Sequence, residues 1–333
     1  MKSYEVVVLM FLLCCLLTTV LRITKVENEV KPFKPPQMKR QPLEKSKTCP
    51  GCKGQIDKVM KEFSTSWEKN EKNNAEFRNL LHKKCNGSNH AIICQDKYPR
   101  GSKIGKIPVA GDLANILPLH SPFFNKTWDT CSVVGNGGIL FDSNCGAKID
   151  SADFVFRCNL PPLDKFKKHV GNKSGLVTAN RSILRLNSKS NPKSLLQRVS
   201  QYGDAMILIS DLSSAILAHT VKPLKQLKSP VRPVFLNHQY LQKLKAFWSS
   251  KGVKERFVTS GLIIISLAME VCKTVNVYGF WPFGRHPFGL YYLSHHYYDN
   301  NPPKPGVHNM PVEFEKLVDL HRKGILRLHL NNC

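Results

Sequence analysis

The stretch CSVVGNGGILFDSNCGAKIDSADFVFRCN, residues 131–159, determines the fold that we expect. An expected buried strand at residues 132–134 leads directly into the turn GNGG at residues 135–138, where glycines leave backbone amides accessible to a ligand. A second apolar run, 154–156, brings Asn159 to the same edge of a sheet if both runs are parallel strands. A strand, a glycine turn and a second strand are typical of a nucleotide-binding unit, whose ligand lies at the carboxyl ends of the strands.

Two other interpretations of the glycine turn are open. A dinucleotide-binding fingerprint requires G-x-G-x-x-G, and Leu140 stands where its third glycine belongs. A tight turn that binds no ligand would show the same local pattern. The choice between them depends on the rest of the chain.

Further apolar runs extend the strand pattern towards the C-terminus. Buried strands are expected at residues 176–179, 205–209 and 234–236, and a helix at 238–250 that ends at Gly252. Strands that alternate with helix-length segments predict a mostly parallel sheet, covered by helices on both faces.

The N-terminal part of the chain has the composition of an export segment. Residues 6–21 form an unbroken apolar run, which we interpret as a transmembrane signal-anchor behind a cytoplasmic tail of residues 1–5. A cleaved signal peptide is the alternative, although residues 18–20 lack the A-x-A pattern. Residues 22–122 would form a stem that includes a Pro- and Lys-rich linker, and residues 123–333 the head domain.

The cysteines agree with an oxidising compartment. The chain has 11 cysteines, and Cys49, Cys52, Cys85 and Cys94 bracket a segment with helical periodicity. C-x-x-C followed by two widely spaced cysteines is not a regular zinc pattern, so we expect these four to form disulfides, with their pairing open.

N-linked glycosylation is expected at three sequons. They start at Asn86, Asn125 and Asn172, and a fourth formal sequon starts at Asn180.

A second informative stretch covers residues 257–283. Thr259 and Ser260 can cap an apolar helix at 262–271, and Gly261 permits close approach of a ligand. The N-terminus of such a helix can bind a phosphate or a carboxylate, although a capped core helix without a ligand has the same pattern. A strand at 275–278 follows, and it places Trp281 at its carboxyl end.

Two histidine segments lie beyond this strand. The sequence SHHYYDN contains His295 and His296, and His308 is followed five positions later by Glu313, which could orient a histidine ring. Imidazole is suited to proton transfer near neutral pH, but a single loop histidine is more often only hydrated or hydrogen-bonded. The chain then closes with an expected helix at 313–323 and a strand at 325–330.

Together these segments resemble the four sialylmotifs of the animal sialyltransferases. The large motif corresponds to residues 131–159, the small one to 257–283, the third to 294–300 and the very small one to 308–313. The runs CNLPP, YGFWPF and SHHYYDN are most similar to the α2,8-sialyltransferase branch, although this chain has Thr259-Ser260 where that branch usually has Ser-Thr. The resemblance implies a GT-A-like variant of a Rossmann architecture, with residues 123–333 as the catalytic domain.

The implied activity is an inverting, metal-independent transfer of sialic acid. CMP-sialic acid would be the donor, and the 8-hydroxyl of a terminal sialic acid on a glycoprotein or glycolipid glycan the acceptor. The sequence has no D-x-D, the carboxylate pair expected where a metal holds a nucleotide diphosphate sugar, so no metal or other cofactor is expected. The alternatives are a sialyltransferase of another linkage, acting on galactose or GalNAc, and a sialoglycan-binding protein without transfer.

The resemblance also implies residue roles and a location. His308 would be the base and His296, rather than His295, would assist departure of CMP. Cysteines 131 and 272 would pair, as would 145 and 333, leaving Cys158 free, and Asn180 would be unglycosylated because it contacts the donor. The protein would be a single-pass type II protein of the Golgi membrane with a lumenal head. The residues implied to line the donor pocket are Asn136, Asn159, Asn180, Thr259, Ser260, Gly261 and Trp281.

The net charge of +25 suggests one further functional class, that of a basic nucleic-acid-binding module. The export segment and the cysteines argue against it, and an anionic donor with an anionic acceptor provides another use for positive charge. We therefore expect no nucleic-acid partner.

Overall fold

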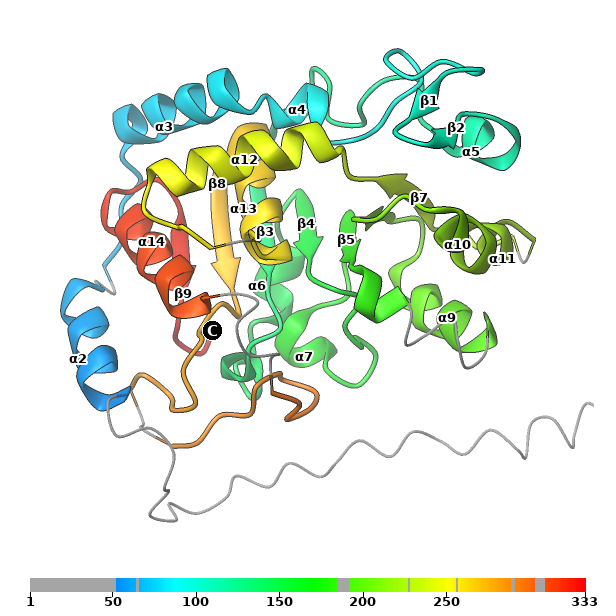
Figure 1. Cartoon of the computed structure of the whole chain (residues 1–333). Coiled ribbons are helices and arrows are strands. Elements are labelled where there is room, and N and C mark those ends of the chain that lie inside the picture. The colour runs from blue at the N-terminus through cyan, green and yellow to red at the C-terminus, as the bar shows by residue number, and fades with distance from the viewer. Residues whose placement is uncertain are drawn as a thin grey trace, which may run out of the picture. The chain divides into compact units, whose positions relative to one another are not determined.

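The structure, a computed structural model, describes residues 52–63, 66–184, 192–226, 228–255, 257–288, 291–302 and 309–333 (Figure 1). The chain divides into two units, Met1–Lys39 and Arg40–Cys333, and all described residues belong to the second. The expected tail, signal-anchor and linker, and also Cys49 and His308, lie outside the described residues. Among the helices that are described, none combines the length and apolarity needed to cross a bilayer.

A seven-stranded parallel sheet forms the centre of the second unit, as the sequence predicted. Its order is β7-β6-β5-β4-β3-β8-β9, and every neighbouring pair is parallel. The chain order reverses at β3, so the carboxyl ends of β3 and β8 form the switch point at which α/β sheets bind ligands. The strands are β3 Trp128–Val134, β4 Phe154–Arg157, β5 Leu176–Ala179, β6 Met206–Ile209, β7 Arg232–Phe235, β8 Cys272–Tyr278 and β9 Arg327–His329.

The sheet separates two clusters of buried residues. One cluster includes residues of α3, α12, α13 and α14, and the other includes residues of α6, α7 and α9. A small hairpin, β1 Lys103–Ile104 with β2 Ile107–Pro108, precedes the sheet. The α-helices are α2 Cys52–Glu62, α3 Glu71–Lys84, α4 Gly87–His90, α5 Gly111–Ile116, α6 Gly146–Asp150, α7 Lys167–Val170, α9 Pro192–Val199, α10 Ser214–Ile216, α11 Lys222–Gln226, α12 His238–Ser250, α13 Ser260–Val271 and α14 Met310–Arg322.

Helix α13 is almost wholly buried. Eleven of its 12 residues are buried, so it is a core helix rather than an amphipathic one. Its polar Ser266 donates to the Leu262 carbonyl at 2.6 Å and accepts from the Trp248 indole N–H at 2.9 Å. The helix runs back from the carboxyl edge of the sheet, at Thr259, to the start of β8 at Cys272.

The segment before residue 123, which we expected to belong to the stem, packs against this core. Leu81 of α3 is fully buried, and Phe77 contacts the rings of Phe247 and Trp248 on α12. Figure 1 shows α3 alongside α12. Ile93 donates its N–H to the Phe235 carbonyl of β7. The hydrophobic core therefore includes residues on both sides of position 123, because α3 covers apolar surface of α12 and α13.

Cys85 and Cys94 are free and buried, so the expectation that both form disulfides is wrong. Each lies in the apolar cluster under α12 and α13, where a thiol packs as a small hydrophobic group. Burial raises the pKa of each thiol to about 12.

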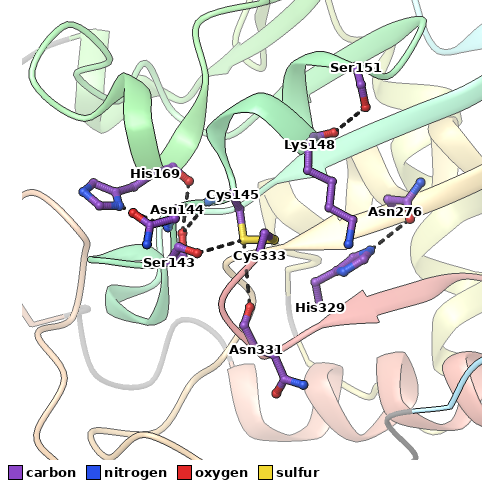
Figure 2. Close-up of a disulfide and its surroundings, with 10 residues drawn as sticks. All are labelled: Ser143, Asn144, Cys145, Lys148, Ser151, His169, Asn276, His329, Asn331 and Cys333. Atoms are coloured by element: carbon purple, nitrogen blue, oxygen red, sulfur yellow. Dashed lines mark hydrogen bonds between the residues drawn. A yellow bond between two sulfur atoms is a disulfide. The ribbon is translucent and has the colours of Figure 1, made fainter.

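Both disulfides implied by the resemblance are present. Cys131 of β3 is joined to Cys272 of β8, and Cys145 at the start of α6 is joined to the C-terminal Cys333 (Figure 2). Cys158 is free and buried, as expected. The first bridge fixes β3 to β8, the two strands that flank the switch point.

Candidate active site

The glycine turn joins the ends of β3 and β8. Gly135 donates its N–H to the Tyr278 carbonyl at 2.8 Å, and Gly137 donates to the Gly279 carbonyl at 2.9 Å. A Cβ on Gly135 would lie 2.5 Å from the Gly279 oxygen, and one on Gly138 would lie 2.1 Å from the Ser294 oxygen. The glycines are thus required for close contact between backbone segments. Contrary to our expectation, the amides of Gly135 and Gly137 are not open to a ligand.

Three asparagines follow the carboxyl ends of β3, β4 and β5. Asn159 and Asn180 have partners for their side-chain oxygens, since the Thr178 hydroxyl lies 3.2 Å from Oδ1 of Asn159 and the Ile183 N–H lies 2.9 Å from Oδ1 of Asn180. Asn136 donates from Nδ2 to the Cys158 carbonyl at 2.9 Å. Its Oδ1 is buried and has no hydrogen-bond partner within the described part of the chain.

The N-terminus of α13 is held by a carboxylate from α14. Thr259 accepts the Leu262 N–H at 3.0 Å, which confirms the expected cap. Its own N–H and hydroxyl donate to the two carboxylate oxygens of Glu313, at 3.1 and 2.5 Å. Glu313 is 6% exposed, and burial raises its pKa to about 7 although the two bonds from Thr259 act in the opposite direction. Glu313 therefore binds the helix cap.

Aromatic side chains fill the space next to this helix end. A Cβ on Gly261 would lie 2.4 Å from the Phe280 ring, so the missing side chain admits Phe280. Trp281 is 4% exposed, donates its indole N–H to the Arg285 carbonyl at 2.6 Å and packs edge-on against Phe314 of α14. Trp281 thus anchors the loop after β8.

The segment of the third motif, which contains His295 and His296, lies against the glycine turn. His296 pairs with Gly137 in an isolated antiparallel bridge, and Tyr297 donates its N–H to the Asn136 carbonyl at 2.9 Å. His296 Nδ1 lies 2.7 Å from Oδ1 of Asp299, and its ring stacks on Tyr298 with 5.1 Å between centroids. Asp299 therefore favours the tautomer with Nδ1–H, and the His296 ring keeps about a third of its surface exposed.

Asn136, Asn159 and Asn180 follow three neighbouring strands at the carboxyl edge of the sheet, and Phe280 lies next to both the glycine turn and the N-terminus of α13. The chain enters α14 through Asn309, which accepts the Val312 N–H and follows His308 in sequence. Sequence reasoning missed Asp299 and Thr178. Asp299 had a signal, because an acid three positions after a histidine can reach its ring within one turn. The described residues include no group of three or more His, Cys, Asp or Glu placed to hold a metal ion.

Comparison with known proteins identifies the family. The model of glycosyltransferase family 29 (sialyltransferase) matches residues 99–325. The chain belongs to this family. It is a sialyltransferase, as the four motifs had implied.

Its relatives include proteins named as alpha-2,8-sialyltransferases. It is 38% identical to the alpha-2,8-sialyltransferase 8F of Mus musculus, over 80% of this chain and 71% of the relative. It is 36% identical to the human alpha-2,8-sialyltransferase 8E, over 80% of this chain and 75% of that one. The crystal structure of a mammalian sialyltransferase is 18% identical, with 84% of each chain covered and a TM-score of 0.45. The fold assignment rests on the strand order and not on this last likeness.

Proposed function

We propose that this sialyltransferase forms α2,8 linkages, transferring sialic acid from CMP-sialic acid to the 8-hydroxyl of a terminal sialic acid on a glycoprotein or glycolipid glycan. The observation that carries the linkage is 36–38% identity, along about four fifths of the chain, to relatives named as α2,8-sialyltransferases. The donor site would lie at the switch point between β3 and β8.

The unsatisfied oxygen of Asn136 supports a ligand at this point. A buried acceptor without a partner is unfavourable by about 1–3 kcal/mol, and a hydroxyl or amino group of the CMP portion would satisfy it. The first amides of α13, at Ser260 and Gly261, have no intrahelical partners and would bind the phosphate or the sialic acid carboxylate. Asn159, Asn180, Thr259 and Trp281 complete the proposed pocket, mainly by fixing its backbone.

The reaction is a substitution at C2 of sialic acid. The acceptor hydroxyl attacks C2 from the face opposite CMP, the bond between C2 and the phosphate oxygen breaks, and its electron pair stays on CMP. His308 takes the hydroxyl proton, and configuration at C2 inverts.

His296 would stabilise the departing phosphate. With Nδ1–H donated to Asp299, a proton on Nε2 can be donated to a phosphate oxygen, and the carboxylate stabilises the charged ring. In this scheme protein donors neutralise the phosphate without a metal.

Localisation follows from the same proposal. The apolar run 6–21 would anchor a type II protein in the Golgi membrane, with the described unit in the lumen. The two disulfides support an oxidising compartment.

An acceptor panel tests the proposal. The purified full-length chain would be incubated with CMP-sialic acid and glycans that end in sialic acid, galactose or GalNAc, and product linkage determined by mass spectrometry and sialidase digestion. We expect product only on sialylated acceptors, with α2,8 linkage. Product on galactose or GalNAc would support another linkage, and CMP binding without any product would support a binding protein.

A further inference from the structure

The sheet places the sequons at different edges. Asn125 precedes β3 and Asn172 precedes β5, so both lie at the amino edge, whereas Asn180 follows β5 at the carboxyl edge. A glycan at the amino edge leaves the proposed donor site unobstructed.

Among the four sequon asparagines, Asn125 and Asn172 are exposed, whereas Asn86 and Asn180 are half-buried. Oδ1 of Asn86 accepts from Asn89 at 2.7 Å, and Oδ1 of Asn180 caps a helical turn. Asn125 and Thr127 are exposed, and the Asn125 side chain makes no hydrogen bond within the described residues. Asn125 has φ 54°, a left-handed conformation that asparagine tolerates.

An aromatic ring stands exposed directly beside this asparagine. Phe124 is 51% exposed, whereas Phe123 is fully buried and packs on Trp128. Two backbone bonds hold the turn, from the Phe124 N–H to the Ser121 carbonyl and from the Lys126 N–H to the Phe123 carbonyl. The turn therefore fixes one phenylalanine in the core and the next one in solvent.

We propose that an N-glycan on Asn125 packs its first sugar against Phe124. The N-acetylglucosamine ring would be linked to the residue next to Phe124, whose Cα is about 3.8 Å away, so the sugar and the Phe124 ring would belong to neighbouring residues of one exposed turn. One face of this sugar carries mainly C–H groups, and contact with Phe124 removes apolar surface of both from water.

The glycan is a better occupant than a membrane or another protein. Phe124 and Leu119, which is 62% exposed, are large apolar side chains of the kind that mark interaction surfaces. A sugar on Asn125 would occupy the space over Phe124 and keep a broad partner surface away from it. This inference needs glycosylation of the chain but not the proposed α2,8 specificity.

The test is a four-member cycle of full-length chains made in eukaryotic cells. The chains are the wild type, Phe124→Ser, Thr127→Ala and the double variant, with occupancy at Asn125 measured on intact glycopeptides. Thr127→Ala removes the sequon and leaves Asn125 in place. We prefer it to Asn125→Gln, because glutamine at φ 54° would add its own strain. We expect the glycan to raise Tm by about 2–4 °C when Phe124 is present and by less than about 1 °C when it is not.

Two controls sharpen the cycle. Phe288→Ser removes a ring of similar exposure, 48%, far in sequence from any sequon, and should leave the glycan effect unchanged. Trimming the glycan to one sugar should retain most of the Tm shift. An unoccupied Asn125 in the wild type, or an equal glycan effect with and without Phe124, would overturn the proposal. Since Tm and occupancy are measured without transfer, neither outcome depends on the proposed function.

Discussion

Two buried glutamates stand at opposite ends of α13, and their surroundings differ. Glu270, near the C-terminal end of the helix, accepts the Gly87 N–H at 2.9 and 2.7 Å, and His82 Nδ1 lies 3.3 Å from it. Glu313 belongs to α14 and accepts the N–H and hydroxyl of Thr259 at the N-terminal end. Burial raises the pKa of both carboxyls.

The helix dipoles explain the difference in role. A carboxylate is unfavourable at a helix C-terminus, so Glu270 requires the amide of α4 and His82, and it serves to attach α4 to the core. Glu313 lies at the N-termini of two helices, where a carboxylate is favoured and where the proposed donor site is also located. We infer that α13 has a structural end and a reactive end.

The largest expected effect is that of removing the proposed base. His308→Ala should lower turnover by about two to four orders of magnitude, because a general base acts on the rate and little on ground-state binding. CMP affinity and the free energy of unfolding should stay near wild-type values, and activity should survive EDTA. Turnover within about tenfold of wild type, or loss of activity on chelation, would refute this mechanism.

At the structural end, Gly87→Ala should have the opposite effect to His308→Ala: it should lower stability and leave turnover unchanged. Its Cβ would lie 2.7 Å from Oε1 of Glu270 and 2.9 Å from the Tyr240 ring, with both groups buried. We expect a loss of about 1–3 kcal/mol in urea unfolding and unchanged turnover per folded molecule. Gly54→Ala on α2, where nothing lies within 4 Å, is the matched control and should not destabilise. A stable Gly87→Ala protein with reduced turnover would reverse the assignment of the two ends.

A smaller effect should distinguish Glu313 by its pH dependence. Because its pKa is raised to about 7 in the folded state, the folded protein binds more protons than the unfolded chain between that value and about 4.3. Stability should therefore rise as pH falls, by about 1 kcal/mol from pH 8 to 6, and Glu313→Gln should lose this increment. Parallel stability curves for the two proteins would show that Glu313 does not titrate in this range.

Local patterns predicted most of the sheet and its helices. The strand expected at residues 176–179 is β5, and the helix expected at 238–250 is α12. Both have strong local signals, since β5 is a short apolar run and α12 has an Asn237 cap and a buried stripe. The expected strand 132–134 is longer in the structure, where β3 begins at Trp128. Pairing of Trp128 with Cys272 of β8 includes the more polar residues before 132 in the strand.

Contacts between distant segments were beyond local patterns. Glu313 is 54 residues from Thr259, and nothing near either residue indicates that they meet. Likewise the close approach of Gly138 to Ser294 depends on packing of the loop after β8. Whether Cys85 and Cys94 form disulfides or stay as buried free thiols depends on the packing of α3 on the core, which composition did not reveal.

Hydrogen exchange with and without CMP tests the distinction between the two ends most directly. Amides at a helix N-terminus have no intrahelical partner, so they exchange unless a ligand accepts their hydrogen bonds. We predict that CMP slows exchange in peptides spanning residues 135–140 and 259–263 of the full-length chain and leaves residues 82–92 and 270–273 unchanged. Protection confined to residues 82–92, or no protection at 259–263 with CMP bound, would contradict a reactive site at the N-terminus of α13.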